Sequence, residues 1–304
     1  MNKIKVVISG LIYPVTMLHY FWRAFERRED IELFVTGPFF DDWIPWSGGL
    51  TLPKKYVKVP HFPLPRNMSN IPSTLVEAQL PWKPNLWLEI DAGWHFNNKP
   101  NANIVAHIQT DPHVLKDFYK IPKARSDFNF CMQTPYQQNG EIYLPYAYDP
   151  TVHYPMPEVE KIHGACIIGL QYDNRTNLVN RLKQLGLNVY YSIGDVYDEY
   201  RLKYNQSKVA LSWSSLQDMP ARIWEAFGMG CALVTNRVPD LSTFFVEGEH
   251  YLGFNNVDEA VNQIRRLLND ENLRITMAEA GHRKAEFHTW DHRIQQLLET
   301  VKLI

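Results

Sequence analysis

The chain has 304 residues, of which 45% are hydrophobic and 21% charged, and its formal net charge is −2. These values are close to those of average globular proteins, and the length suits two domains of ordinary size. They exclude a strongly basic chain that would be drawn to nucleic acid or to an anionic membrane surface.

The three cysteines, Cys131, Cys166 and Cys231, lie far apart in the sequence. An odd number without close spacing argues against a disulfide framework and against a zinc site, so we expect buried thiols in a reducing cytosol. No apolar stretch is long enough to span a membrane. The sequence therefore predicts a cytoplasmic protein with no integral membrane segment, and it leaves open a peripheral position at the inner membrane face.

The chain opens with a strand, a helix and a second strand. Residues 4–10 are a continuous apolar run that ends in glycine, residues 15–30 place apolar side chains at helical spacing, and residues 31–37 form another apolar run. This order predicts a parallel α/β sheet. Residues 38–84 are rich in proline and aromatic residues, and we interpret them as a long insertion. A solvated loop is its simpler reading, but five of its residues would also suit contact with a sugar or an anionic acceptor: Trp43, Trp46, Lys54, Lys55 and Lys58.

Further strands are predicted over residues 85–93, 103–111 and 127–134. Four candidate catalytic residues follow the ends of the first two: Asp91, His95, Asp111 and His113. Ligands of open α/β sheets bind at that edge, so these side chains would bind an acceptor hydroxyl or line a sugar pocket. For each histidine, an ordinary loop position is the alternative. Gly10, at the end of the first strand, would leave room for close approach of a substrate.

A proline-rich segment over residues 144–157 is predicted to be a linker, after which the strand and helix alternation restarts. Strands are expected over residues 164–169, 188–194, 207–213, 231–236 and 251–254, with a helix over residues 175–186. From residue 258 onward the pattern is almost entirely helical. This organisation predicts two α/β lobes, with the ligand site in the cleft between them.

The stretch "MPARIWEAFGMGCALVTN", residues 219–236, carries the most specific signal. Asp218 is predicted to cap a helix whose first turn holds Pro220. Arg222 and Glu225 lie three residues apart and share a face. A diphosphate at the helix start would use Arg222, and a ribose diol would bind Glu225. An ordinary ion pair between these two side chains is the alternative.

Several segments, in order, resemble the GT-B glycosyltransferases with a group-1 C-terminal domain, in their spore-maturation CgeB-like branch. The resemblance covers about half of the chain and rests on "CIIGLQYDNRTNLVNRL", "LSWSSLQDMPARIWEAFGMGCALVTN", "FVEGEHYLGFNNVDEAVNQIRRLLND", "HTWDHRIQQLL" and the connection "LPYAYDPTVHYP". It implies two Rossmann-like domains facing across a cleft, with closing C-terminal helices. The predicted domains are an acceptor domain over residues 1–147, a linker over 148–158 and a donor domain over 159–304.

The resemblance also implies a retaining, GT4-like glycosyltransferase, most simply a hexosyltransferase, that uses a nucleotide diphosphate sugar as substrate, with a UDP-sugar favoured. By this resemblance Glu225 holds the donor ribose, Arg222 and Arg175 lie near the diphosphate in place of a metal, and Gly169 opens the phosphate loop. The full predicted donor set is Gly169, Tyr172, Arg175, Ser192, Gly194, Gln217, Asp218, Met219, Pro220, Arg222 and Glu225. Gln217 stands where the wider family has an acid near the transferred sugar, so the resemblance does not determine the donor sugar or full activity.

No Asp-x-Asp motif occurs in the chain. Enzymes that hold a nucleotide sugar through Mg²⁺ or Mn²⁺ need converging carboxylates, whereas cationic side chains and helix amides can stabilise the same charge. We therefore expect metal independence and no cofactor. A nucleobase would suit the strand end at Tyr190 and Tyr191, with Ser192, Gly194 and Asp195, although both tyrosines would also suit packing. Two other functions stay open, a non-catalytic GT-B-like binding module and a nucleotide-sugar epimerase, and the acceptor, whether glycan, lipid, protein or small molecule, is not predicted.

Overall fold

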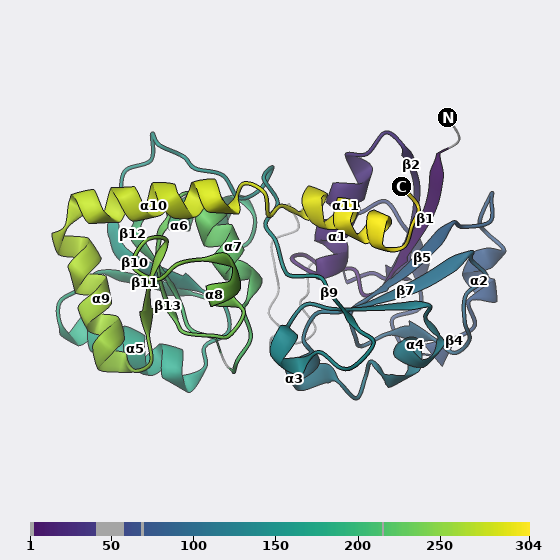
Figure 1. Cartoon of the computed structure of the whole chain (residues 1–304), viewed down its shortest axis with the longest axis horizontal. Helices are drawn as coiled ribbons and strands as arrows, with labels where there is room; N and C mark the ends of the chain where they lie inside the picture. The colour runs from purple at the N-terminus through teal and green to yellow at the C-terminus, as the bar shows by residue number, and fades with distance from the viewer. Residues whose placement is uncertain (1–2, 41–57, 68–69, 215) are drawn as a thin grey trace. The chain divides into compact units, whose positions relative to one another are not determined.

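The computed structural model describes residues 3–40, 58–67, 70–214 and 216–304. Four residues of the predicted insertion, Trp43, Trp46, Lys54 and Lys55, therefore lie outside the described residues. The chain divides into two compact units (Figure 1). The first unit comprises Met1–Pro145 and Trp290–Ile304, and the second comprises Tyr146–Thr289.

The first unit contains a parallel seven-stranded sheet in the order β3-β2-β1-β5-β7-β8-β9. Its strands are β1 Ile4–Ser9, β2 Ile31–Pro38, β3 Phe62–Leu64, β5 Leu86–Ile90, β7 Ile104–Gln109, β8 Phe128–Cys131 and β9 Ile142–Tyr143. Val6, Val7 and Ile8 of β1 are fully buried, as a continuous apolar run in a central parallel strand requires. A separate pair of short strands, β4 Asn70–Ile71 and β6 His95–Phe96, forms a second sheet.

The helices of the first unit are α1 Met17–Glu26, α2 Thr74–Glu77, α3 Pro112–Leu115, α4 Lys120–Arg125, the 3₁₀ turn η1 Thr134–Tyr136 and α11 Trp290–Thr300. α11 packs beside α1, where the rings of Trp290 and Tyr20 stack with centroids 6.0 Å apart. An ion pair between Arg27 and Asp291, 2.7 Å long, adds to this contact. The expectation that the domain over residues 159–304 includes the last helix therefore differs from the structure, because the apolar face of α11 is buried against α1.

The second unit contains a parallel five-stranded sheet in the order β11-β10-β12-β13-β14. Its strands are β10 His163–Ile168, β11 Val189–Ser192, β12 Ser207–Ser212, β13 Ala232–Asn236 and β14 Tyr251–Phe254. β11 pairs with one side of β10 and β12 with the other, so the strand order reverses at β10. The sequence pattern predicts a parallel α/β unit, and the family resemblance implies a Rossmann-like one; the observed strand order is doubly wound.

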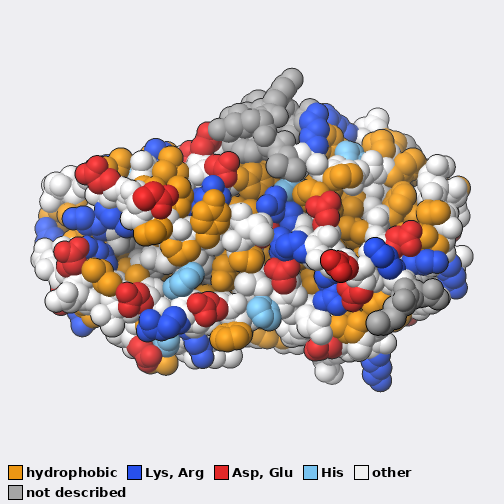
Figure 2. Space-filling model, turned by 90° about the horizontal axis from the view of Figure 1, so that it is seen from above, with side chains coloured by type: hydrophobic (Ala, Val, Ile, Leu, Met, Phe, Trp, Pro, Cys, Tyr) orange, Lys and Arg blue, Asp and Glu red, His pale blue; other side chains and the backbone are white. Residues whose placement is uncertain are grey.

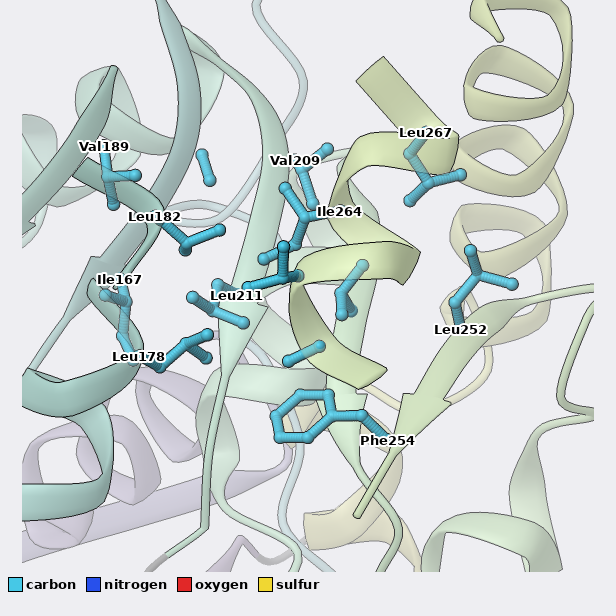
Figure 3. Packing of buried hydrophobic residues seen from close by; sticks show 14 of the residues in the cluster. Ile167, Leu178, Leu182, Val189, Val209, Leu211, Leu252, Phe254, Ile264 and Leu267 are labelled. Atoms are coloured by element: carbon cyan, nitrogen blue, oxygen red, sulfur yellow. The ribbon is translucent and has the colours of Figure 1, made fainter. Parts of the chain in front are cut away.

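The helices of the second unit are α5 Asp173–Gln184, α6 Asp198–Asn205, α7 Ala221–Gly228, α8 Leu241–Phe244, α9 Val257–Asn269 and α10 Glu271–Ala285. Leu178 and Leu182 of α5, with Ile264 of α9, pack against the sheet in a core of aliphatic side chains (Figure 3). The predicted helical run after residue 258 is divided by Asp270, whose side chain accepts a hydrogen bond from the amide of Leu273 and caps α10.

The longest of the described helices, α10, has 15 residues. Within the described part of the chain, no helix is both long enough and apolar enough to cross a bilayer.

Candidate functional site

The reversal of strand order at β10 marks one edge of the second sheet. In open α/β sheets, ligands bind at such a switch point, beyond the carboxyl ends of the strands. Gly169 follows β10 directly, and its amide donates a hydrogen bond to the carbonyl of Ser192 at the end of β11. The predicted phosphate-loop glycine therefore lies at the switch point.

Gly169 occupies a position where a side chain would displace an arginine. Its φ of +140° is a conformation that glycine adopts more readily than other residues. A Cβ atom at this position would collide with the guanidinium of Arg222 and would lie 3.8 Å from Nη1 of Arg175. The structure thus brings both predicted arginines to the backbone at the end of β10.

Backbone carbonyl groups hold both guanidinium groups in place. Nε of Arg222 donates to the carbonyl of Ile168 at 2.8 Å. Arg175 donates through Nε to the carbonyl of Trp213 and through Nη1 to that of Leu170, both at 2.7 Å. Nη1 of Arg222 is buried and has no hydrogen-bond partner among the described residues. A buried donor without a partner costs free energy, so an acceptor on a bound ligand would be favourable at this position.

The carboxylates of Asp218 and Glu225 act on Arg175 and Arg222, respectively, from beyond ion-pair distance. Among the described residues, neither arginine forms an ion pair. Burial and, to a smaller extent, the positive charge of Arg222 lower the pKa of Arg175 to about 10. Arg175 still carries its charge at neutral pH. Two cations that repel each other at a buried sheet edge favour a bound anion.

The prediction that Asp218 caps the following helix is wrong. Its carboxylate accepts hydrogen bonds from the hydroxyl of Ser214 at 2.5 Å and from the amide of Leu216 at 3.2 Å. The carboxylate is therefore used to close its own loop. Pro220, predicted in the first turn, occupies the N-cap position of α7 instead, and no side chain caps this helix.

Glu225 lies on α7, where two side chains from other segments face its carboxylate. The hydroxyl of Tyr200 on α6 donates to Oε2 at 2.7 Å. Nε2 of His153 lies 3.8 Å from Oε1, while its Nδ1 accepts a hydrogen bond from the amide of Asp149. In the neutral ring, the proton therefore resides on Nε2 and faces the carboxylate. Glu225 and Arg222, both among the described residues, form no ion pair with each other. The alternative interpretation of this helix, an ordinary ion pair between these two side chains, is therefore wrong.

The sequence did not predict Tyr200 and His153 as site residues. Tyr200 lies in "DVYDEYRLKYN", a segment for which no helix was expected. A helical reading would have placed Tyr200 and Tyr204 on one face, four residues apart. His153 lies in the predicted linker, and nothing in its local pattern indicates a contact with residue 225.

The remaining residues of the predicted donor set differ in their surroundings and in their exposure to solvent. The ring of Tyr172 precedes α5 and lies under the guanidinium of Arg175, 4.8 Å from the ring centroid. Gly194 follows β11 with a φ of +101°. Gln217 is exposed, whereas Met219 is buried. Met219 therefore fits packing rather than ligand contact.

The two tyrosines of the predicted nucleobase site are engaged on opposite faces of β11. The hydroxyl of Tyr190 donates to Asp195 at 2.9 Å, and that of Tyr191 lies 3.0 Å from Oγ1 of Thr176. Tyr191 packs against the aliphatic core. These contacts agree with the alternative interpretation, in which the two tyrosines pack partly in the core and partly at the surface.

In the first unit, Asp91 and Asp111 follow the adjacent strands β5 and β7. Asp91 has a φ of +67°, a strained conformation for a non-glycine residue. Its carboxylate accepts hydrogen bonds from Thr110 at 2.5 Å and from the hydroxyl of Tyr119 at 2.9 Å. Burial, with the negative charge of Asp111, raises the pKa of Asp91 to about 6. The predicted pair of carboxylates is therefore brought together at the sheet edge.

The two predicted histidines lie on different elements of the first unit. His95 lies in β6, on the separate two-stranded sheet, and among the described residues no hydrogen bond or ion pair connects it to Asp91. Burial and the nearby Arg125 lower its pKa. His113 lies in α3, with its ring 5.4 Å from that of Tyr136.

The prediction that Gly10 leaves room for a substrate is wrong. A Cβ atom on Gly10 would lie 2.5 Å from the carbonyl oxygen of Ile90, and one on Gly37 would collide with the carbonyl of Gly10. Neighbouring backbone occupies this space. Within the described part of the chain, no three His, Cys, Asp or Glu side chains form a group suited to a metal ion.

Residues 157–299 match a family described as glycosyl transferase-like. An α-glucosyltransferase in complex with UDP and a 13-mer DNA containing an HMU base has a TM-score of 0.67 at 12% identity, over 99% of this chain and 100% of that chain. HepE from Anabaena in complex with UDP-glucose has a TM-score of 0.66 at 10% identity, with the same coverage. Sucrose-phosphate synthase from Thermosynechococcus elongatus has a TM-score of 0.66 at 12% identity, over 99% of both chains.

No sequence among curated proteins matches the chain. At these identities the structural likeness shows the fold alone, and that fold is GT-B, as the sequence predicted. The family match covers most of the second unit and most of α11. Together, the family match and the structural relatives support a GT-B glycosyltransferase.

Proposed function

We propose that the chain is a glycosyltransferase that binds a nucleotide diphosphate sugar, with a UDP-sugar favoured, at the switch point of its second unit. One observation carries the proposal: the guanidinium groups of Arg175 and Arg222 meet at Gly169, and the buried Nη1 of Arg222 has no partner among the described residues. A diphosphate would supply acceptors and opposite charge at this point. The solved relatives that contain UDP or UDP-glucose support the choice of nucleotide.

Glu225 is proposed to accept hydrogen bonds from the donor ribose. Its carboxylate has more lone pairs than the single donor from Tyr200 uses. Tyr200 and His153 hold the side chain in one orientation, which lowers the cost of ordering it when the ribose binds. The sequence segments that resemble the CgeB-like branch are the basis for this role and for placing the chain in that branch.

Transfer is proposed to proceed with retention and without a metal. The leaving diphosphate gains negative charge in the transition state, and fixed guanidinium groups stabilise such charge without reorganising. In front-face transfer the donor phosphate itself takes the proton of the acceptor hydroxyl. Asp91 and Asp111 of the first unit would then position an acceptor rather than act as strong bases. Hexosyl transfer, the absence of a cofactor and the absence of a nucleic-acid partner remain predictions.

The test is a thermal-shift panel of UDP, GDP and their sugars, with and without EDTA. A nucleotide present at about 100 times its Kd should stabilise the protein by about 2.7 kcal/mol. We expect Arg222→Ala and Glu225→Ala to abolish the shift and EDTA to leave it intact. Arg181→Ala is the matched control, because Arg181 is exposed on the same helix as Arg175. A shift that survives Arg222→Ala would refute the diphosphate site, and a shift lost in EDTA would refute metal independence.

A non-catalytic GT-B-like binding module is the second candidate. Gln217 favours it, because an exposed amide stands where the wider family has an acid near the transferred sugar. Measurement of nucleotide release from UDP- and GDP-sugars separates the two functions. A chain that binds the nucleotide as expected but releases none with any sugar and acceptor would be this module. Consumption of the donor without an acceptor would instead indicate an epimerase.

A further inference from the structure

The second unit has a cavity at the sheet edge opposite Gly169. Its volume is about 480 Å³, within the range of small-molecule sites. It is lined by Lys208 and Ala232, near the amino ends of β12 and β13, by Pro155, Met156, Pro157 and Lys161, and by one face of α10. Figure 1 shows α10 running beside the β12 and β13 region of this unit. The proposed donor site does not include any of these residues.

The apolar part of the cavity lining is mostly aliphatic. Met156 and Met229 contribute flexible thioether side chains, and Ile275 and Ala278 of α10 contribute branched and small ones. His282 is the single ring among the described lining residues other than the prolines, so the surface is poorly suited to stacking a nucleobase or sugar. An alkyl chain would fit such a surface, because flexible apolar side chains adapt to its shape. Ile275 is 48% exposed, so it is available for contact with such a chain.

The charges at the cavity are unbalanced. Glu271 pairs with Arg274 at 2.5 Å, and Glu279 pairs with Arg283 at 3.8 Å. Lys161 and Lys208 also line the cavity, and neither forms an ion pair among the described residues. Each lining glutamate is thus paired with an arginine, whereas the two lysines are not paired with any described residue, and their charges remain available to an anion. Figure 2 shows hydrophobic and charged side chains interspersed over the surface of the molecule on one face.

We propose that this cavity binds a medium-chain fatty-acid anion. The alkyl chain would lie against Met156, Met229 and Ile275, and the carboxylate would lie between Lys161 and Lys208. Burial of the alkyl chain removes its apolar surface from water and supplies the main favourable contribution to binding. The two ammonium groups supply the charge complementarity that selects an anion over an alcohol.

Calorimetric titration of the full chain with decanoate tests the proposal, with 1-decanol and inorganic phosphate as comparison probes. We expect decanoate to bind with a stoichiometry of one, decanol to bind at least tenfold more weakly, and phosphate not to bind at this site. The double variant Lys161→Ala/Lys208→Ala should weaken decanoate about tenfold, as the loss of two exposed ion pairs implies. The matched control, Lys183→Ala/Lys284→Ala, removes two exposed lysines that do not line the cavity and should leave the affinity unchanged.

The variant Ile275→Glu tests the apolar part. Ile275 is exposed, so the substitution should not prevent folding, and circular dichroism checks this. We expect decanoate binding to be lost. Equal affinity for decanol and decanoate, an unchanged affinity in the lysine double variant, or full binding by Ile275→Glu would each overturn the proposal. Because UDP binding is measured separately, failure here leaves the proposed function untouched.

Discussion

The hydroxyl of Tyr200 donates a hydrogen bond to Oε2 of Glu225 at 2.7 Å, and this contact joins α6 to α7. Burial raises the pKa of Tyr200 well above its ordinary value, and the charge of Glu225 raises it further. The hydroxyl therefore remains protonated and donates throughout the accessible pH range. A hydrogen bond to a charged acceptor is stronger than one between neutral groups, so Tyr200 fixes the carboxylate that the proposed function assigns to the ribose.

Substitution Tyr200→Phe should weaken UDP binding about tenfold, because Glu225 loses its donor and is less well oriented. The Kd for UDP from calorimetry measures this effect. Tyr251→Phe, on β14, is the control and should leave the Kd unchanged. If Tyr200→Phe binds UDP as tightly as the natural chain, Glu225 either needs no support from Tyr200 or does not contact the nucleotide.

Substitution Gly169→Ala should abolish UDP binding. A Cβ atom at this position collides with the guanidinium of Arg222, which must leave its place at the end of β10. The strained backbone adds a destabilisation of about 1–3 kcal/mol. Thermal unfolding with and without UDP measures both effects.

Gly186→Ala separates strain from displacement of the arginine. Gly186 also has a positive φ, of +78°, but a Cβ atom there would meet nothing within 4 Å. This control should lose about 1 kcal/mol of stability and keep its UDP affinity. Equal UDP binding by the two alanine variants would show that Arg222 is not needed in its observed place.

The sequence predicted the strands of the second unit well, because each is a short apolar run that ends at a polar or small residue. It predicted Gly169, Arg175 and Arg222 as neighbours only through family resemblance, since these residues are widely separated along the chain. Helix α6 escaped prediction because "DEYRLKYN" has little apolar periodicity. Its role depends on a long-range contact with Glu225, which no local pattern reports.

The capping prediction failed for a local physical reason. Asp218 has the right side chain for a cap, but Ser214 and Leu216 offer it closer donors within its own loop. The assignment of α11 failed for a different reason. Its amphipathic pattern indicates that one face is buried but does not identify the surface that buries it, which is α1.

Substitution Arg125→Met should destabilise the first unit by about 3–5 kcal/mol. Arg125 Nη2 lies 2.5 Å from Oε1 and 2.7 Å from Oε2 of Glu89, and both side chains are largely buried. Removal of the cation leaves a buried carboxylate without its charge partner. The free energy of unfolding in urea measures the loss.

The double variant Glu89→Leu/Arg125→Met should recover most of this stability, since no buried charge remains. Both residues lie in the first unit, so UDP binding should not change in either variant. If the single and double variants are equally unstable, packing of the arginine side chain rather than its charge accounts for the loss.

Substitution Asp91→Asn should make the stability of the protein less dependent on pH. Burial and the charge of Asp111 raise the folded pKa of Asp91 from 3.8 to about 6. The folded state therefore binds the proton more tightly than the unfolded state does. The stability that this proton provides is fully present below about pH 4 and is lost as the pH rises through 6.

Above pH 6 the natural chain must accommodate a buried carboxylate. The asparagine variant removes that charge, while its side-chain oxygen can still accept from Thr110 and Tyr119. We expect Asp91→Asn to gain about 1–3 kcal/mol at pH 7.5 and nothing at pH 4. Urea unfolding of both proteins between pH 4 and pH 8 measures the difference.

Asp30→Asn is a control of opposite sign for this pH dependence, because the hydrogen bond from Arg28 lowers the pKa of Asp30. A lowered pKa contributes stability that is present above the unfolded value of 3.8 and is lost as the pH falls through the folded value. Asp30→Asn should therefore be less stable than the natural chain at pH 7.5, where Asp91→Asn is more stable. A gain for Asp91→Asn that is the same at pH 4 and pH 7.5 would show that the carboxylate does not titrate in this interval.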